Sequence, residues 1–152
     1  MNQIKVFNRY KDIEYKNEVI LLIKEQMKSI KANKSEEEID KALRNALMEG
    51  KRASLFVCYD EKEIAGFIFG NVSSGIESGR DYFWINEIHV KEEKRRKKIG
   101  SLLIKYLEKW LSEQGIKYIA CMTGKDNEAS QKMFKKLEFD ENDVVWIDKN
   151  IV

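Results

Sequence analysis

Residues 81–111 read DYFWINEIHV KEEKRRKK IGSLLIKYLEKWL and determine the architecture expected for the chain. Residues 81–90 are rich in aromatic and β-branched side chains, which predicts a strand. In residues 102–111 the apolar side chains recur at helical intervals, which predicts an amphipathic helix. A strongly basic segment therefore joins a strand to a helix.

Lys94–Lys98, called the basic turn below, contains five consecutive basic residues at this junction. The first N–H groups of a helix lack partners within the helix and face outward, where they bind anions. Gly100, at the start of the helix, lets a ligand approach the backbone closely. A solvated basic loop is the alternative, but the position between strand and helix favours an anion-binding turn.

Other elements follow on both sides of this unit. Ser35 with Glu38 three residues later forms a capping box that opens a helix ended by Gly50. Gly115 followed by Ile116 is typical of a helix end, and Asp126 or Asn127 can cap a last helix. The expected strands are 4–7, 54–59, 64–72, 81–90, 117–122 and 144–151, with a loop at 73–80 and helices over 12–30, 36–47, 99–111 and 128–137. This order predicts an α/β chain with a central mixed sheet flanked by helices.

Composition limits the function. The 152 residues suit a single domain over 1–152, and a net charge of +2 gives no average-charge argument for a nucleic-acid or membrane partner. One His and two Cys cannot form a usual structural zinc site, so no metal is expected. Cys58 and Cys121 form no disulfide framework, which fits a reducing cytoplasm. No apolar run approaches about 20 residues and residues 1–18 are polar, so neither a membrane span nor a signal peptide is expected.

Two motifs resemble those of the GNAT superfamily of N-acetyltransferases. Residues 95–100, RRKKIG, resemble its R/Q-x-x-G-x-G/A signature, with Lys98 in place of the middle Gly. Residues 127–139, NEASQKMFKKLEF, resemble N-x-x-A-x-x-x-Y-x-x-x-G-F and keep Asn127 and Phe139. In this motif Ser130 replaces Ala, Phe134 replaces Tyr and Glu138 replaces Gly. The resemblance implies a GNAT-like acyl-CoA N-acyltransferase fold with acetyl-CoA as co-substrate.

The same resemblance assigns binding roles. The CoA pyrophosphate is expected on the backbone amides of residues 96–101, and pantetheine on strand 81–90 where strand 117–122 splays away from it. Asn127 matches a residue that holds the pantetheine arm, although it can equally be a plain helix N-cap. The expected cofactor-binding residues are Ile88, His89, Val90, Arg95, Arg96, Lys97, Lys98, Ile99, Gly100, Ser101, Asn127 and Phe134. Phe134 replaces the family's proton-donating Tyr, and it can also be a core aromatic.

Acetyl transfer to an amine requires removal of a proton, because a primary ammonium has a pKa near ~10. Regular alternation along strand 81–90 places Ile85, Glu87 and His89 on one face, and Ile88 and Val90 on the other. A carboxylate on a covered face is costly unless it is paired or used. Glu87 is therefore the first candidate base and His89 the second. A salt bridge or a solvated edge position is the alternative for each.

The leading expectation is an N-acetyltransferase that acts on a primary amine, first of a small molecule, by direct attack in a ternary complex. The alternatives are a protein acetyltransferase for N-terminal or lysine amines, and a non-catalytic CoA-binding module suggested by Lys98 and Phe134. Glu36–Glu38 can attract a cationic acceptor or simply favour the helix dipole. Cys121 is a buried strand residue rather than a nucleophile. The resemblance also allows a homodimer formed through the C-terminal strand.

Overall fold

The computed structural model describes residues 1–151, which form two compact units, 1–122 and 123–151. The strands of the first unit are β1 (Asn2–Phe7), β2 (Ala53–Asp60), β3 (Glu63–Gly75), β4 (Arg80–Val90) and β5 (Ile119–Cys121). Its helices are α1 (Lys16–Ser29), α2 (Glu36–Ala46) and α3 (Ile99–Glu113), with short 3-10 turns η1 (Tyr10–Asp12) and η2 (Glu92–Lys94). The second unit contains α4 (Glu128–Lys136). The expectation of a single domain stays a prediction.

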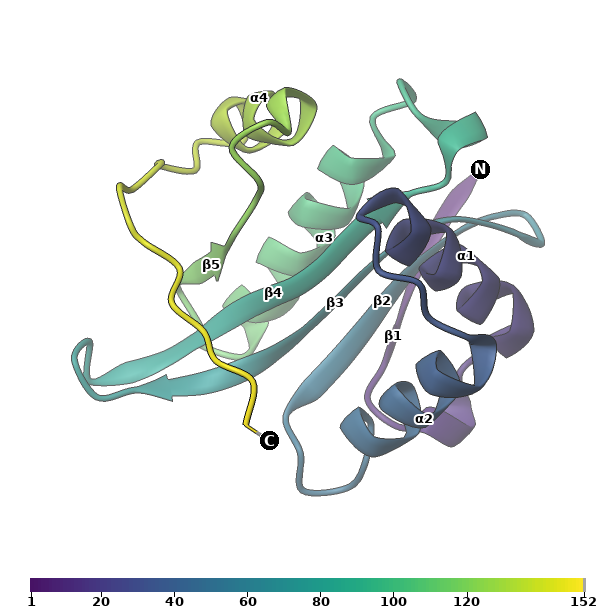
Figure 1. Cartoon of the computed structure of the whole chain (residues 1–152), viewed down its shortest axis with the longest axis horizontal. Helices are drawn as coiled ribbons and strands as arrows, with labels where there is room; N and C mark the ends of the chain where they lie inside the picture. The colour runs from purple at the N-terminus through teal and green to yellow at the C-terminus, as the bar shows by residue number, and fades with distance from the viewer. Residues whose placement is uncertain (152) are drawn as a thin grey trace. The chain divides into compact units, whose positions relative to one another are not determined.

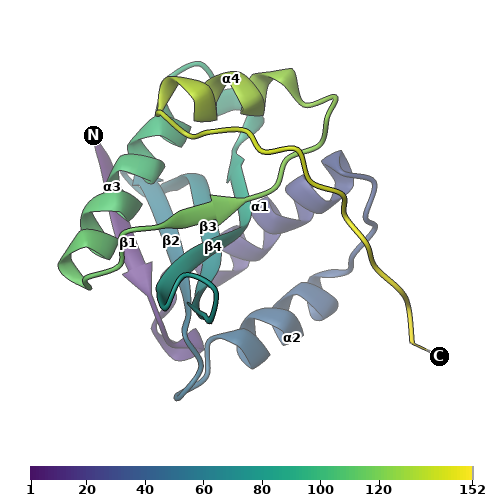
Figure 2. The same cartoon turned by 90° about the vertical axis from the view of Figure 1, so that its left-hand side faces the viewer.

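The sheet has the order β1-β2-β3-β4-β5, and its strands are antiparallel except for the parallel pair β4 and β5. Helices α1 and α2 cover one face and α3 covers the other, as Figures 1 and 2 show. A mixed sheet flanked by helices was the architecture expected from the order of the elements, and it is confirmed. The crossover through α3 brings β5 alongside β4 in the parallel direction.

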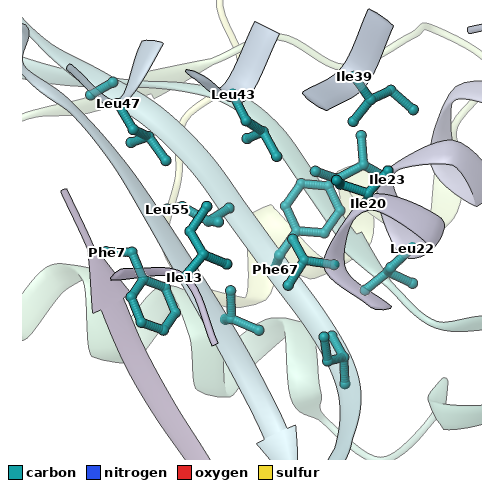
Figure 3. Close-up of a cluster of buried hydrophobic side chains, with 14 of the residues drawn as sticks. Phe7, Ile13, Ile20, Leu22, Ile23, Ile39, Leu43, Leu47, Leu55 and Phe67 are labelled. Carbon is teal, nitrogen blue, oxygen red and sulfur yellow. The ribbon is translucent and has the colours of Figure 1, made fainter. Parts of the chain in front are cut away.

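The face under α1 and α2 carries a continuous apolar core (Figure 3). Its side chains come from both helices and from the central strands, and they include Ile20, Ile23, Leu43, Leu55 and Phe67. The start of α2 is fixed by the expected capping box. Ser35 Oγ accepts from the Glu38 N–H at 3.1 Å, and Glu38 Oε2 accepts from the Ser35 N–H at 2.8 Å.

The opposite face packs against the apolar side of α3. Phe56 makes edge-to-face contacts with Phe83 and Trp110, with ring centroids 6.1 and 5.3 Å apart. Helix α3 ends as expected, since Gly115 has φ +75° and the Ile116 N–H donates to Leu111 O at 2.9 Å. This packing fixes where the N-terminus of α3 meets the end of β4.

Three expected elements differ in the structure. Much of the loop at 73–80 belongs to strands, because β3 and β4 continue to a turn at 76–79. Strand β5 covers only Ile119–Cys121 rather than 117–122. The strand expected over 144–151 is wrong, because these residues have no ladder partner in the described part of the chain and Val145 and Ile147 are 82% and 86% exposed. A strand needs a partner for its N–H and C=O groups, which local β propensity cannot supply.

Candidate active site

A register shift in β4 determines which way its polar side chains point. Glu87 lies opposite Phe69, but Ile85 lies opposite Gly70, so Asn86 has no partner in β3. Residues directly opposite each other share a face of the sheet. Glu87 therefore points to the face of α1 and α2, and Ile85 points to the face of α3. The expectation that Ile85 shares a face with Glu87 and His89 is wrong, because a bulge interrupts the alternation.

Glu87 is half-buried beneath α1 and is held by a side chain of that helix. Gln26 Nε2 donates to Glu87 Oε2 at 2.5 Å, and Gln26 itself is only 6% exposed. Burial raises the pKa of Glu87 above its usual value, and the hydrogen bond from Gln26 partly opposes this effect. A carboxylate whose pKa moves toward neutrality is a better proton acceptor at neutral pH.

His89 is buried two residues further along the same face, beside the ring of Phe67. Its Nε2 lies 3.8 Å from Glu25 Oε2, too far for a hydrogen bond, and has no other partner among residues 1–151. Burial lowers the pKa of His89, Glu25 opposes this shift, and the charge of Arg95 adds to it. The imidazole of His89 is therefore neutral at neutral pH. In this form it can accept a proton, but it does not form an ion pair with Glu25.

β4 has an unpaired edge, called the open edge below, over residues 86–90. β5 pairs only with Phe83–Ile85, and within residues 1–122 no strand continues along this side. The Lys91 N–H donates to Ala65 O of β3, and bonded positions alternate along an antiparallel ladder. Ile88 and Val90 therefore direct their N–H and C=O groups to the open edge. An extended ligand with amide groups can pair there.

The basic turn leads from this edge into α3 with alternating backbone conformations. Arg96 and Lys98 have positive φ of +66° and +61°, while Arg95 has φ −68°. Among the described residues, the N–H groups of 96–101 find no acceptor in the protein. Successive free N–H groups in such a segment form a concave anion site at the helix N-terminus. Lys98 has a left-handed backbone, a conformation that glycine adopts most easily. This explains why the R/Q-x-x-G-x-G/A signature has Gly at this position.

The side chains of the basic turn fall into two groups. Lys94 is 14% exposed and is paired with Asp60 at 3.1 Å and Glu63 at 2.8 Å, which raises its pKa. It anchors the turn to the β2–β3 hairpin. Arg95 is exposed, and its Nε donates to Val90 O at 3.2 Å. The remaining cations, on residues 96–98, are exposed at the start of α3 and can meet a phosphate-bearing ligand.

Asn127 and Phe134 belong to the second unit. Asn127 Oδ1 accepts from the Ser130 N–H at 3.1 Å, which confirms the N-cap. Phe134 is buried and packs edge-to-face on Phe139, with centroids 5.0 Å apart, as expected for a core aromatic. Their roles toward the cofactor stay predictions. Cys121 is half-buried, and burial raises its pKa to about 11, which keeps it protonated.

Gln26 and Glu25 on α1 lie within the range 25–47 that the resemblance implies for the acceptor side, but neither residue was predicted to have a role of its own. Gln26 follows Ile23 at a helical interval and so occupies a position of the apolar stripe. A polar residue in such a stripe marks the position as unusual but does not show which side chain it meets. Glu25 Oε1 accepts from the Glu92 N–H at 3.3 Å, which ties α1 to the end of β4.

No helix within residues 1–151 has the length and apolar composition of a membrane span. The same range contains no cluster of three or more His, Cys, Asp or Glu side chains that could hold a metal ion.

The model of the acetyltransferase (GNAT) family matches residues 19–139. An acetyltransferase of Pectobacterium atrosepticum is 31% identical over 90 residues, which are 59% of this chain and 62% of that protein. The match thus spans less than two thirds of the relative's length.

Solved structures agree in fold. An aminoglycoside acetyltransferase from an uncultured soil metagenomic sample, in complex with sisomicin, has a TM-score of 0.84 at 18% identity, covering 99% of this chain and 97% of that one. AAC(6')-Iy in complex with a bisubstrate analogue of CoA has a TM-score of 0.79 at 18% identity, covering 99% of both chains. These likenesses confirm the expected fold. Because the family model covers most of the sequence, the chain belongs to the acetyltransferase (GNAT) family.

Proposed function

We propose that the chain is an acetyl-CoA-dependent N-acetyltransferase that acetylates a primary amine of a small molecule by direct attack in a ternary complex. The observation that carries this proposal is the arrangement of β4. Its free amides at Ile88 and Val90 lie beside the carboxylate of Glu87, and the same strand runs into the anion-binding basic turn. The proposed cofactor-binding groups and the proposed proton acceptor thus lie on the same strand.

The N–H groups of residues 96–101 and the dipole of α3 would hold the pyrophosphate of CoA. The exposed cations of Arg96, Lys97 and Lys98 add charge, since CoA carries further phosphate. Lys98 fits this role, because its left-handed backbone keeps the amides directed outward while its side chain stays at the surface. Ile99 and Gly100 are buried and contribute backbone rather than side chains.

The N–H and C=O groups of Ile88 and the N–H of Val90 on the open edge would pair with the amides of the pantetheine arm, while Val90 O already accepts from Arg95 Nε. When bound, acetyl-CoA supplies the activated acetyl group as a thioester. Ile88 itself points to the α3 face, opposite Ile68, so only its backbone is offered to the ligand. The assignment of Asn127 to this arm belongs to the same proposal.

Glu87 accepts the proton of the attacking amine, directly or through water. The amine nitrogen forms the new C–N bond, the C–S bond breaks, and the sulfur leaves as a thiolate. A thiol with a pKa near ~8.5 is a tolerable leaving group, so Phe134 in place of a proton-donating Tyr does not prevent the reaction. His89, neutral and buried, stays the second candidate for the proton relay.

The preference for a small-molecule acceptor is supported by the fold shared with the aminoglycoside acetyltransferase that was solved with sisomicin. A screen with acetyl-CoA should read free thiol for aminoglycosides, polyamines and peptides with free N-termini or lysines. Turnover with a small amine and none with peptides is the expected result. Turnover with peptides alone would favour the protein acetyltransferase, and binding of CoA without turnover would contradict the enzymatic proposal. A homodimer and a cytoplasmic location remain predictions.

A further inference from the structure

Helix α1 buries one polar side chain in an otherwise apolar stripe. Its buried residues are Val19, Ile20, Leu22, Ile23 and Gln26. Gln26 Oε1 has no hydrogen-bond partner among the described residues. A buried amide oxygen without a partner costs stability that an apolar side chain of similar size would not cost. The packing of α1 therefore does not by itself explain a glutamine here.

The NH₂ group of the same amide explains why a glutamine occupies this buried position. Gln26 Nε2 donates to Glu87 Oε2, and this is the one side-chain hydrogen bond that Glu87 accepts within residues 1–151. An ionised carboxylate accepts but does not donate, so the amide must present its NH₂ group to Glu87. This orientation leaves Gln26 Oε1 unpaired and Glu87 Oε1 free of protein partners.

The bulge at Asn86 brings Glu87 within reach of Gln26. Because the register shifts there, Glu87 leaves the phase of Ile85 and faces α1 instead of α3. The neighbouring groups on this face are Glu25 on α1 and His89 on β4, while the residue of β3 opposite Glu87 is the uncharged Phe69. Arg95 of the basic turn acts on His89 rather than on Glu87.

We infer that Gln26 is a positioning residue that holds one oxygen of Glu87, leaves the other free for the acceptor amine and favours the ionised carboxylate. This inference rests on the proposed function, in which Glu87 is the base. Burial and the Gln26 hydrogen bond act on the carboxylate in opposite directions, so the side chain of Gln26 sets where along the pH axis the base becomes active.

The test replaces Gln26 with Met, which fits the apolar stripe but cannot donate. In Gln26→Met the pKa of Glu87 should rise by about one unit or more, measured by a ¹³C NMR titration of its carboxyl carbon. The acid limb of the pH profile of kcat/KM should move to higher pH by the same amount. Gln26→Glu should move both further, because a second carboxylate disfavours ionisation. Ile23→Met, one turn earlier in the same stripe, is the matched control and should move neither.

An unchanged pKa of Glu87 in Gln26→Met would overturn the inference. An unchanged acid limb of the kcat/KM profile in Gln26→Met would also overturn it. If Glu87→Gln were inactive in that case, Glu87 would still be the base, but Gln26 would not position it. A Glu87→Gln variant with the rate and pH profile of the unchanged protein would overturn both the base and its positioning. In the Glu87→Gln background, Gln26→Met should have no further effect on the profile.

Discussion

Lys94 Nζ lies 2.8 Å from Glu63 Oε2, so the first cation of the basic turn is bound to β3 before any ligand arrives. Asp60 completes the arrangement from β2 at 3.1 Å. In the basic turn, Lys94 fixes the position of the backbone, whereas the charged side chains of residues 95–98 remain exposed. This division predicts different consequences for substitutions only a few residues apart.

Lys94→Met should lower the melting temperature, whereas Lys97→Met should leave it unchanged, because Lys97 forms no ion pair among residues 1–151. Pairing with Lys94 lowers the pKa of both Asp60 and Glu63, so the stability that it contributes is present at neutral pH and is lost as the pH falls through their folded-state pKa values. The difference in melting temperature between the unchanged protein and Lys94→Met should therefore shrink in acid. A constant difference across pH would contradict the ion-pair explanation.

Lys98→Gly tests the backbone of the anion site. A left-handed conformation costs a non-glycine residue about 1–2 kcal/mol, while glycine loses about 0.4–1 kcal/mol more in unfolded-state entropy. The free energy of unfolding should thus stay unchanged or rise by up to about 1.6 kcal/mol. Lys97→Gly, at a residue without positive φ, should lower it by about 0.4–1 kcal/mol. Denaturant unfolding measures both, and equal losses would contradict the assignment.

Glu87→Gln should change activity and stability in opposite directions. Removal of the base should lower kcat/KM about 100-fold at neutral pH. The folded-state pKa of Glu87 is raised, so the carboxyl favours the folded state below its unfolded pKa and loses that contribution as the pH rises through the folded pKa. The neutral amide should accordingly raise the melting temperature at pH 8 but not in acid. A lower melting temperature at pH 8 would show that the carboxylate has a structural role instead.

Val90→Pro tests the open edge of β4. The N–H of Val90 points away from β3, so proline removes a donor without breaking the β3–β4 ladder. Affinity for CoA, measured by calorimetry, should fall about 3- to 10-fold while the circular dichroism spectrum is retained. His89→Pro is the contrasting variant, since it removes a donor from the ladder and should destabilise the sheet. Loss of structure in Val90→Pro would mean that the open edge was assigned to the wrong residues.

Much of the fold was accessible from the sequence because its signals are local. The capping box at Ser35, the apolar periodicity of residues 102–111 and the strand before the basic turn each depend on neighbouring residues. The bulge at Asn86 depends instead on how β4 fits β3, and the pairing of Lys94 depends on two strands distant in sequence. The expected final strand failed for the same reason, because β propensity does not provide a partner.

The candidate site divides in the same way. The anion-binding turn and Glu87 could be proposed from residue type and position in a strand-to-helix unit. Gln26 could not, because a glutamine within an amphipathic helix has no meaning until the opposing side chain is known. The face of Ile85 was mispredicted because regular alternation cannot show where it is interrupted.

The unpaired Asn86 also makes β4 two half-strands of opposite phase. The first half sends Phe83 and Ile85 into the α3 core, and the second sends Glu87 and His89 beneath α1. Without Asn86, Ile85 and Glu87 would be direct neighbours, whose side chains alternate between faces, so both could keep their present partners in β3. If Asn86 instead entered the ladder opposite Phe69, the rest of β4 would slip by one residue and the carboxylate would turn into the apolar layer beneath α3. By staying out of the ladder, Asn86 lets one continuous strand line an apolar core at its start and a polar site at its end.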